Sequence, residues 1–208
     1  MDRRHLAWIL LLASIAYVAS FYFIGSAIKP GYSQISNFVS EYNAAGTPWA
    51  DTLTYAGFAA TSALLSAFLA VSIPLFDASR ASRVGAWLLW SLPASYFLAV
   101  IAPCDLGCPI DGSSSQVAHN LLAVVTYFGM GLSVLLISFD SRFNTSRRAF
   151  LLAVGVSFPV VFFLMVQPAF EQWGGIMQRA LDVAMAASLA IALRTFIPLG
   201  HKLRRAAA

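Results

Sequence analysis

The sequence has few charged residues for its length. Charged side chains make up 11% of the 208 residues and hydrophobic ones 59%, whereas a soluble globular domain carries about 25% charged residues. The mean hydropathy is +0.74. Together with apolar runs of transmembrane length, this composition is typical of a protein that lies in a lipid bilayer, and it excludes an ordinary water-soluble domain.

Histidine and cysteine are also scarce, with three and two residues. The histidines form neither an HxxxH nor an HExxH pair, so a zinc hydrolase that binds its metal through several histidines is not expected. A haem held by two histidines is excluded, because His5 and His201 lie in the terminal segments and only His119 falls near the outer half of a span. We therefore expect no metal and no cofactor.

The apolar runs predict an all-α polytopic membrane protein, a six-transmembrane-helix bundle forming one domain over residues 1–208. The expected helices are Leu6–Gly25, Asp51–Phe76, Val84–Ala102, Val117–Phe139, Ala149–Val166 and Ile176–Ile197. The first run is interpreted as a retained helix rather than a signal peptide, because it has the length of a span and no small-x-small cleavage site precedes a soluble domain. Pro93 is a predicted kink, Pro159 lies inside the fifth helix, and Pro198 is expected to end the sixth.

The basic residues predict the orientation. The formal net charge is +4, but Lys and Arg lie in short clusters in the two terminal segments and in connectors 77–83 and 140–148, while the other loops contain only Lys29. This is the positive-inside pattern rather than a nucleic-acid-binding stripe. We expect a protein of the cell membrane with both termini cytoplasmic, so that the polar segment Pro103–Asn120 faces outward.

The outer segment Ser33–Asn43, SQISNFVSEYN, has its apolar residues at helical spacing. This pattern predicts a short interfacial helix. Two interpretations remain open. The segment is either a solvated surface helix or a lid that places Glu41, with Ser40 beside it, over a cavity.

Cys104 and Cys108 are separated by three residues in a predicted outer loop. In an oxidising compartment a disulfide is the favoured interpretation, and its use would be to fix Asp105. Free thiols and a metal pair are the alternatives. The metal pair is the weakest of them, because no second pair of ligands is present.

His119 is predicted at the outer end of the fourth helix, beside Asn120. It is either a structural residue or a general base whose imidazole Asp105 orients. In the sixth helix, Arg179 and Asp182 share one face and follow Gln178. Arg179 is expected to point into the bundle, to pair with Asp182 or a loop acid, and to share a cavity with His119, Asp105 and Glu41. The alternative is a purely structural ion pair.

Several runs resemble the domain of unknown function 998 family of bacterial and archaeal membrane proteins. They are PGYSQISNFVSEYNA (30–44), PCDLGCP (103–109), the His119-Asn120 pair and GIMQRALD (175–182). The resemblance covers nearly the whole chain and implies six membrane helices, with a distant similarity to the Frag–DRAM–Sfk group. It also implies that Ser40, Glu41, Cys104, Asp105, Cys108, His119 and Arg179 occupy family motif positions. The family name assigns no activity.

Three classes of function remain at the level of sequence. The first is a membrane protein that binds or handles a lipid or a small anionic ligand, with Arg179, Glu41, Ser40, Gln178 and Asp182 around it. The second is a lipid hydrolase or transferase with His119 as general base and Asp105 as its orienting acid. The third is an accessory subunit of a larger membrane assembly. Membrane lipids are the expected partners, and nucleic acid is not.

Overall fold

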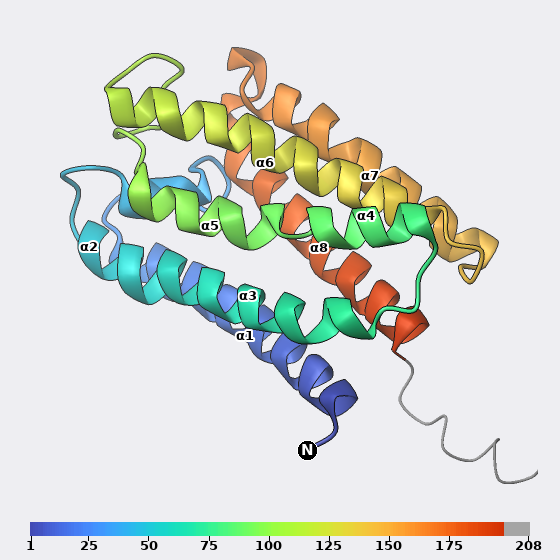
Figure 1. Cartoon of the computed structure of the whole chain (residues 1–208). Helices are drawn as coiled ribbons and strands as arrows, with labels where there is room; N and C mark the ends of the chain where they lie inside the picture. The colour runs from blue at the N-terminus through green and yellow to red at the C-terminus, as the bar shows by residue number, and fades with distance from the viewer. Residues whose placement is uncertain (198–208) are drawn as a thin grey trace, which may run out of the picture.

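Six long helical spans run back and forth along one axis (Figure 1). The structure is a computed structural model that describes residues 1–197, and every element in those residues is helical. All six spans among these residues are long and apolar enough to cross a bilayer, which confirms the predicted fold class. Their bounds are Arg3–Ile28, Ala50–Leu75, Arg80–Ile101, Ser114–Ser138, Thr145–Met165 and Pro168–Phe196.

Three of the spans are single helices. The first is α1 (Arg3–Ile28), the fourth is α6 (Ser114–Ser138) and the fifth is α7 (Thr145–Met165). The second span consists of α2 (Ala50–Leu53), η2 (Thr54–Ala59), α3 (Ala60–Ser72) and η3 (Ile73–Leu75), the third of α4 (Arg80–Leu88) and α5 (Ser91–Ile101), and the sixth of η4 (Pro168–Trp173) and α8 (Gly174–Phe196). One further short helix, η1 (Val39–Asn43), lies in the loop after α1.

The predicted helices overlap the observed spans, and most of their ends differ by up to four residues, as with Val84 against Arg80. The exception is the start of the sixth span, which η4 moves from the predicted Ile176 to Pro168. Polar caps explain most of the difference. The side chains of Asp2, Ser113 and Asn144 each accept a backbone N–H at the start of α1, α6 and α7. Such caps extend a helix beyond its apolar run into polar sequence. The predicted stop at Pro198 lies outside the described residues.

Pro93 and Pro159 both act on helix geometry. The third span breaks between α4 and α5 at Leu89 and Trp90, and Leu89 is the residue whose carbonyl the ring of Pro93 would crowd. In α7, Pro159 has no N–H to offer the Gly155 carbonyl. That carbonyl faces α6, where a Cβ on Gly131 would lie only 2.8 Å from it. Glycine therefore allows α6 and α7 to approach closely, as in many membrane bundles.

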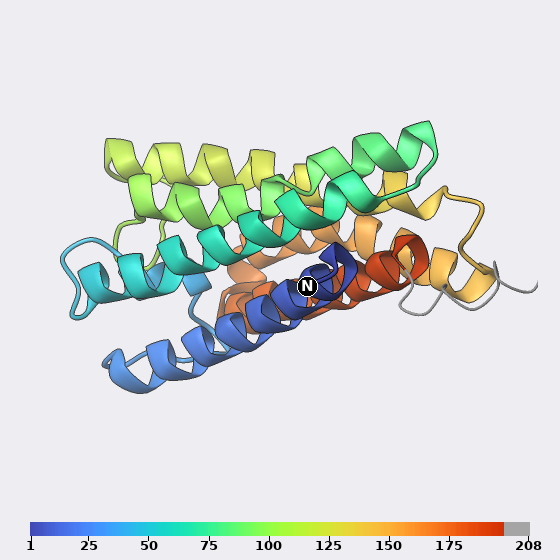
Figure 2. The same cartoon turned by 60° about the horizontal axis from the view of Figure 1, so that its bottom comes forward.

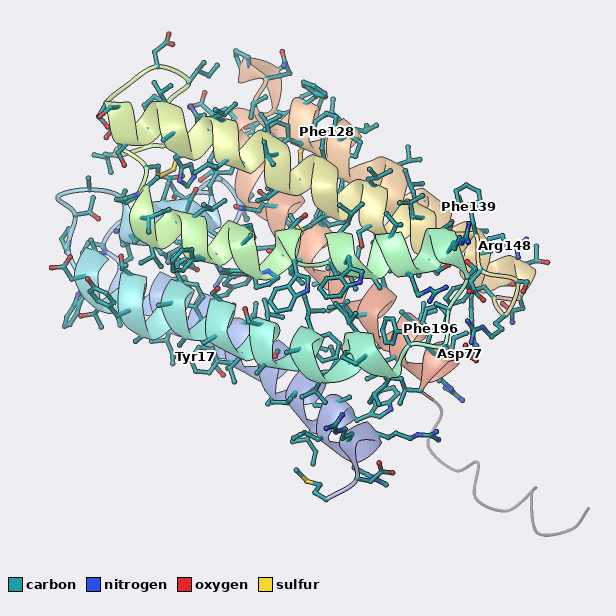
Figure 3. The ribbon with its side chains drawn as sticks, in the orientation of Figure 1. Tyr17, Asp77, Phe128, Phe139, Arg148 and Phe196 are labelled. Carbon is teal, nitrogen blue, oxygen red and sulfur yellow. A yellow bond between two sulfur atoms is a disulfide. The ribbon has the colours of Figure 1, made fainter. Side chains whose placement is uncertain are left out.

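The helix α1 lies at one side of the bundle, against α3 and α8 (Figure 2). A π-helical segment, η2, interrupts the second span opposite it. The hydroxyl of Tyr17 on α1 donates to the carbonyl of Ala56 in this segment (Figure 3). A Cβ on Gly57 would lie 2.2 Å from the Phe21 ring, so glycine is what admits this ring between the two helices.

One end of the bundle, here called the basic end, contains the connectors 77–79 and 139–144 and both ends of the described chain (Figures 1 and 3). Asp140 is buried there, and its carboxylate accepts from Arg142 Nε at 2.8 Å and from the backbone N–H of Ser79 at 3.0 Å. These hydrogen bonds lower the pKa of Asp140 well below its usual range. The opposite end, here called the disulfide end, contains Cys104 and Cys108.

Candidate functional site

A cavity of about 490 Å³ opens among the helices toward the disulfide end. Residues of α1, η2, α5, α6, α7 and α8 form its wall, together with the segments at that end. Aromatic side chains stand among the aliphatic ones of this wall. They are Tyr22, Phe38, Phe58, Tyr96, Tyr127, Phe162 and Phe163. The size is within the 300–1,000 Å³ of typical ligand pockets, which are also mainly apolar with a few placed polar groups.

The polar groups of the wall are few. Four predicted site residues are among them, namely Ser40, His119, Gln178 and Asp182. Glu171 adds a second carboxylate, and it is exposed at the mouth. No lysine or arginine of residues 1–197 lines the cavity. Arg179, Glu41 and Asp105 do not line it either, so the single cavity expected to unite them with His119 is not formed.

Asp182 belongs to a hydrogen-bonded row at the cavity wall. The hydroxyl of Tyr22 donates to its Oδ2 at 2.6 Å. Because the Tyr22 proton is used in this way, the hydroxyl of Tyr96, 2.8 Å away, donates to Tyr22. The row links α8, α1 and α5 inside the membrane-spanning part of the bundle, where a carboxyl group is rare and usually functional.

Arg179 points into the bundle, as expected, but its predicted ion pair is wrong. Among residues 1–197 no carboxylate lies within 4.0 Å of its guanidinium. Nη1 instead donates to the carbonyls of Gln34, Asn37 and Gly175 at 3.0, 3.1 and 2.9 Å. Nη2 donates to the hydroxyl of Tyr32 at 2.5 Å.

The surroundings of Arg179 are aromatic as well as polar. Its Cζ lies 5.5 to 5.9 Å from the ring centroids of Tyr22, Tyr32 and Tyr42, which is a distance at which rings attract a cation. Carbonyl oxygens and ring faces thus replace the expected acid. Only Nε–H is left without an acceptor among the described residues, so Arg179 has little capacity left for an anionic ligand.

The loop that receives Arg179 is not the predicted interfacial helix. Residues 34–36 form a turn and residue 37 a bend, and only η1 is helical, as a 3₁₀ turn. The carbonyls that a helix would use internally are used by α8 instead. Ser36 O accepts from Gly175 N at 3.2 Å and Ile35 O from Ile176 N at 2.9 Å. The first N–H groups of α8, which have no partner in their own helix, are satisfied in this way.

The Gly-Gly pair at the start of α8 explains how this contact is possible. A Cβ on Gly175 would lie 2.3 Å from the Asn37 carbonyl oxygen and 2.8 Å from that of Gln34. A Cβ on Gly174 would lie 2.8 Å from the Phe38 ring. Only glycine lets the loop backbone come this close to the helix, and we call this arrangement of residues 34–38 on Gly174, Gly175 and Arg179 the loop clasp.

Glu41 does not lie over the cavity, as it would if the segment were a lid. Its carboxylate folds back on its own loop, accepting from Phe38 N and from Asn37 Nδ2, both at 2.8 Å. Lys29, also buried, donates from Nζ to the Tyr42 carbonyl at 2.7 Å, and burial lowers its pKa. Glu41 therefore caps a short helix that the loop clasp needs.

The predicted disulfide between Cys104 and Cys108 is present, with the sulfurs 2.08 Å apart. Cys108 lines the cavity and lies 3.2 Å from the hydroxyl of Ser40. The Ala45 N–H donates to the Cys104 carbonyl at 2.9 Å, so the two loops are also joined through the backbone. The disulfide loop is in this way held against the loop after α1.

His119 and Asp105 do not form the predicted pair. His119 Nδ1 lies 2.8 Å from the carbonyl of Ala102, which accepts its N–H. The carboxylate of Asp105 accepts from the N–H and from the hydroxyl of Ser113, each at 2.8 Å. These two bonds lower the pKa of Asp105. Asp105 therefore binds the N-cap residue of α6, and His119 is paired with the Ala102 carbonyl instead of with Asp105.

The two sulfurs and one imidazole nitrogen of His119 lie within 4.8 Å of one another. Two thiolates and an imidazole form a known zinc ligand set. In the disulfide, however, the sulfurs are bonded to each other and carry no thiolate charge for a metal. The arrangement found here therefore fits a disulfide beside a histidine better than a metal centre.

Sequence reasoning missed the aromatic residues of the site. Tyr22, Tyr96 and Tyr127 lie within long apolar runs, where an inward-facing tyrosine has no local signature that separates it from a lipid-facing one. The usable signal is that a tyrosine within a membrane span needs a partner for its hydroxyl. Asp182 supplies that partner for Tyr22.

A protein-family model matches most of the chain. The model for a protein family of unknown function, DUF998, matches residues 11–195. The chain belongs to the DUF998 family. This confirms the resemblance found in the sequence, and it assigns no activity. Comparison with curated proteins found no match, and comparison with solved structures found none either.

Proposed function

We propose that this DUF998 protein binds a membrane molecule, such as a lipid, in its aromatic cavity. The observation that carries the proposal is the cavity itself, whose 490 Å³ is surrounded mainly by aromatic and aliphatic side chains with polar groups at a few points. Such a wall suits a molecule with an apolar body and a small polar group.

The position of the wall residues supports access from the membrane. Val124 on α6 and Phe163 on α7 line the cavity, and their side chains are 39% and 55% exposed. A molecule dissolved in the bilayer would meet these residues first. Ile110 in the disulfide loop and Glu171 in η4 also line the cavity, and both are exposed, so its other side lies near water.

The same geometry gives less support to the other functions considered, which are anion binding, lipid hydrolysis and an accessory role. A small anion would need donors, and Arg179 uses its own in the loop clasp. A lipid hydrolase would need an activated His119, and Asp105 is bonded to Ser113. A cavity within one chain also favours ligand handling over a purely accessory role.

We also propose that the disulfide end faces out of the cell and that both termini are cytoplasmic. Five arginines in the connectors or in the first helical turns after them lie at the basic end, namely Arg80, Arg83, Arg142, Arg147 and Arg148. The positive-inside rule then favours a cytoplasmic basic end, and an oxidising outer compartment suits the disulfide.

Filling the cavity tests the proposal. Ala123 lines it from α6, whereas Val125 on the same helix is 59% exposed and does not line it. Ala123→Trp should reduce the lipid that copurifies with the protein, measured by native mass spectrometry, by about tenfold because the ring occupies the space. Val125→Trp, the matched control, should retain wild-type occupancy. Equal occupancy in the two variants would contradict the proposal.

A further inference from the structure

We propose that the cavity selects an organic cation, an ammonium group carried on an apolar body, with Asp182 as its counter-charge. This inference rests on the proposed function, because it names the chemistry of the molecule that the same cavity binds. It replaces the anionic ligand expected from the sequence. Three features support it, namely the charges of the wall, an oxygen of the Asp182 carboxylate without a partner and the aromatic rings around it.

The cavity wall contains acidic side chains but no basic ones among the described residues. Its carboxylates are Asp182 in the helical part and Glu171 at the mouth, and no lysine or arginine of the described residues lines it. The nearest arginine, Arg179, donates into the loop clasp. A ligand in the cavity therefore meets the Asp182 carboxylate and not the Arg179 guanidinium. A cation would find a counter-charge there, whereas an anion would find no cationic donor in the wall.

Asp182 retains an oxygen for a ligand. Oδ2 accepts from Tyr22 at 2.6 Å, while Oδ1 accepts no hydrogen bond from residues 1–197. A carboxylate has about four acceptor sites, and one in a membrane span is stable only when it is paired or solvated. A bound cation would supply the missing partner. The row of tyrosines would hold the carboxylate in place while this happens.

Aromatic rings complete the site. Tyr22, Phe58 and Tyr96 line the cavity on the α1–α5 side, and Phe58 and Tyr96 have ring centroids 6.2 Å apart. Tyr127 and Phe162 face them from α6 and α7, with centroids 5.0 Å apart. Rings around a carboxylate are how proteins recognise quaternary ammonium groups, which cannot donate hydrogen bonds. The remaining apolar wall suits the body that carries the charge.

Binding of matched probes to the protein in nanodiscs tests the inference. The probes are dodecyltrimethylammonium, its neutral analogue with a tert-butyl group in place of the trimethylammonium group, and dodecyl phosphate. The ammonium probe should bind about tenfold more tightly than either of the others, a difference of 1.4 kcal/mol. Benzyltrimethylammonium separates two sources of the cation, because tight binding of this compact probe indicates a free organic cation and weak binding indicates a chain-bearing amphiphile.

Two variants locate the charge. Asp182→Asn keeps an oxygen for the Tyr22 hydroxyl, and it should weaken binding of the ammonium probe by about tenfold while the neutral probe binds as before. The neutral probe also shows that the variant is folded. Asp111→Asn removes an exposed carboxylate at the disulfide end that does not line the cavity, and it should leave both affinities unchanged.

The outcomes separate the two proposals. Equal binding of the neutral and ammonium probes, or an Asp182→Asn variant that binds the ammonium probe like the wild type, overturns the cation site and leaves the cavity's proposed function intact. Tighter binding of dodecyl phosphate than of the ammonium probe also overturns it. If no probe binds the wild-type protein, both the cation site and the proposed function are contradicted.

Discussion

At the scale of single residues, Arg179 shows how the bundle compensates a charge inside a membrane span. Its guanidinium donates to three backbone carbonyls and to the hydroxyl of Tyr32. The expected partners of Arg179 were acids, because an arginine in a membrane span needs compensation. The structure supplies that compensation from carbonyl oxygens and tyrosine rings, which a single sequence cannot assign because the residues are far apart in the chain.

Gly175 provides the sharpest prediction at this scale. Gly175→Ala places a methyl group 2.3 Å from the Asn37 carbonyl oxygen, which belongs to the backbone and cannot rotate away. We expect the loop clasp to open and the protein to lose about 1–3 kcal/mol of stability, the usual effect of forcing extra carbon into a packed site. Thermal unfolding in detergent, followed by near-ultraviolet circular dichroism, measures the change.

The matched control for this variant adds carbon elsewhere on the same helix. Ala180→Val enlarges an exposed side chain of α8, so it should leave the unfolding temperature close to that of the wild type. A Gly175→Ala protein as stable as Ala180→Val would show that the close contact between the loop and α8 does not exist.

At the scale of elements, hydropathy was enough to find the six spans, because each apolar run has the length of a bilayer crossing. The helix ends depended on caps such as Ser113 and Asn144, which lie in polar sequence outside those runs. The helix predicted from the apolar periodicity of Ser33–Asn43 does not form. Its apolar spacing is helical, but the N–H groups at the start of α8 and the Arg179 guanidinium bind its carbonyls. The sequence of the segment alone gives no sign of these long-range hydrogen bonds.

At the scale of the whole molecule, the two ends of the bundle differ in chemistry. The basic end holds clustered arginines and a buried Asp140, whereas the disulfide end holds the cavity and the loop clasp. The sequence predicted this division from its charge clusters. It did not predict the cavity's composition, because which faces of α5, α6, α7 and α8 meet inside the bundle depends on packing.

The proposed orientation can be tested by cysteine labelling in intact cells. Both native cysteines are in a disulfide, so an added cysteine is the reactive one. Ser114→Cys, exposed at the disulfide end, should react with a membrane-impermeant maleimide. Ser141→Cys, exposed at the basic end, should react only after the cells are permeabilised. The reverse pattern would contradict the orientation.

The most direct test of the central claim is a high-resolution density map of the protein purified in lipid nanodiscs without detergent. We predict elongated density within the cavity, its body against Tyr127 and Phe162 and one end beside the Asp182 carboxylate. A cavity closed by side chains, or one filled only by ordered water, would contradict the claim that this protein binds a membrane molecule there.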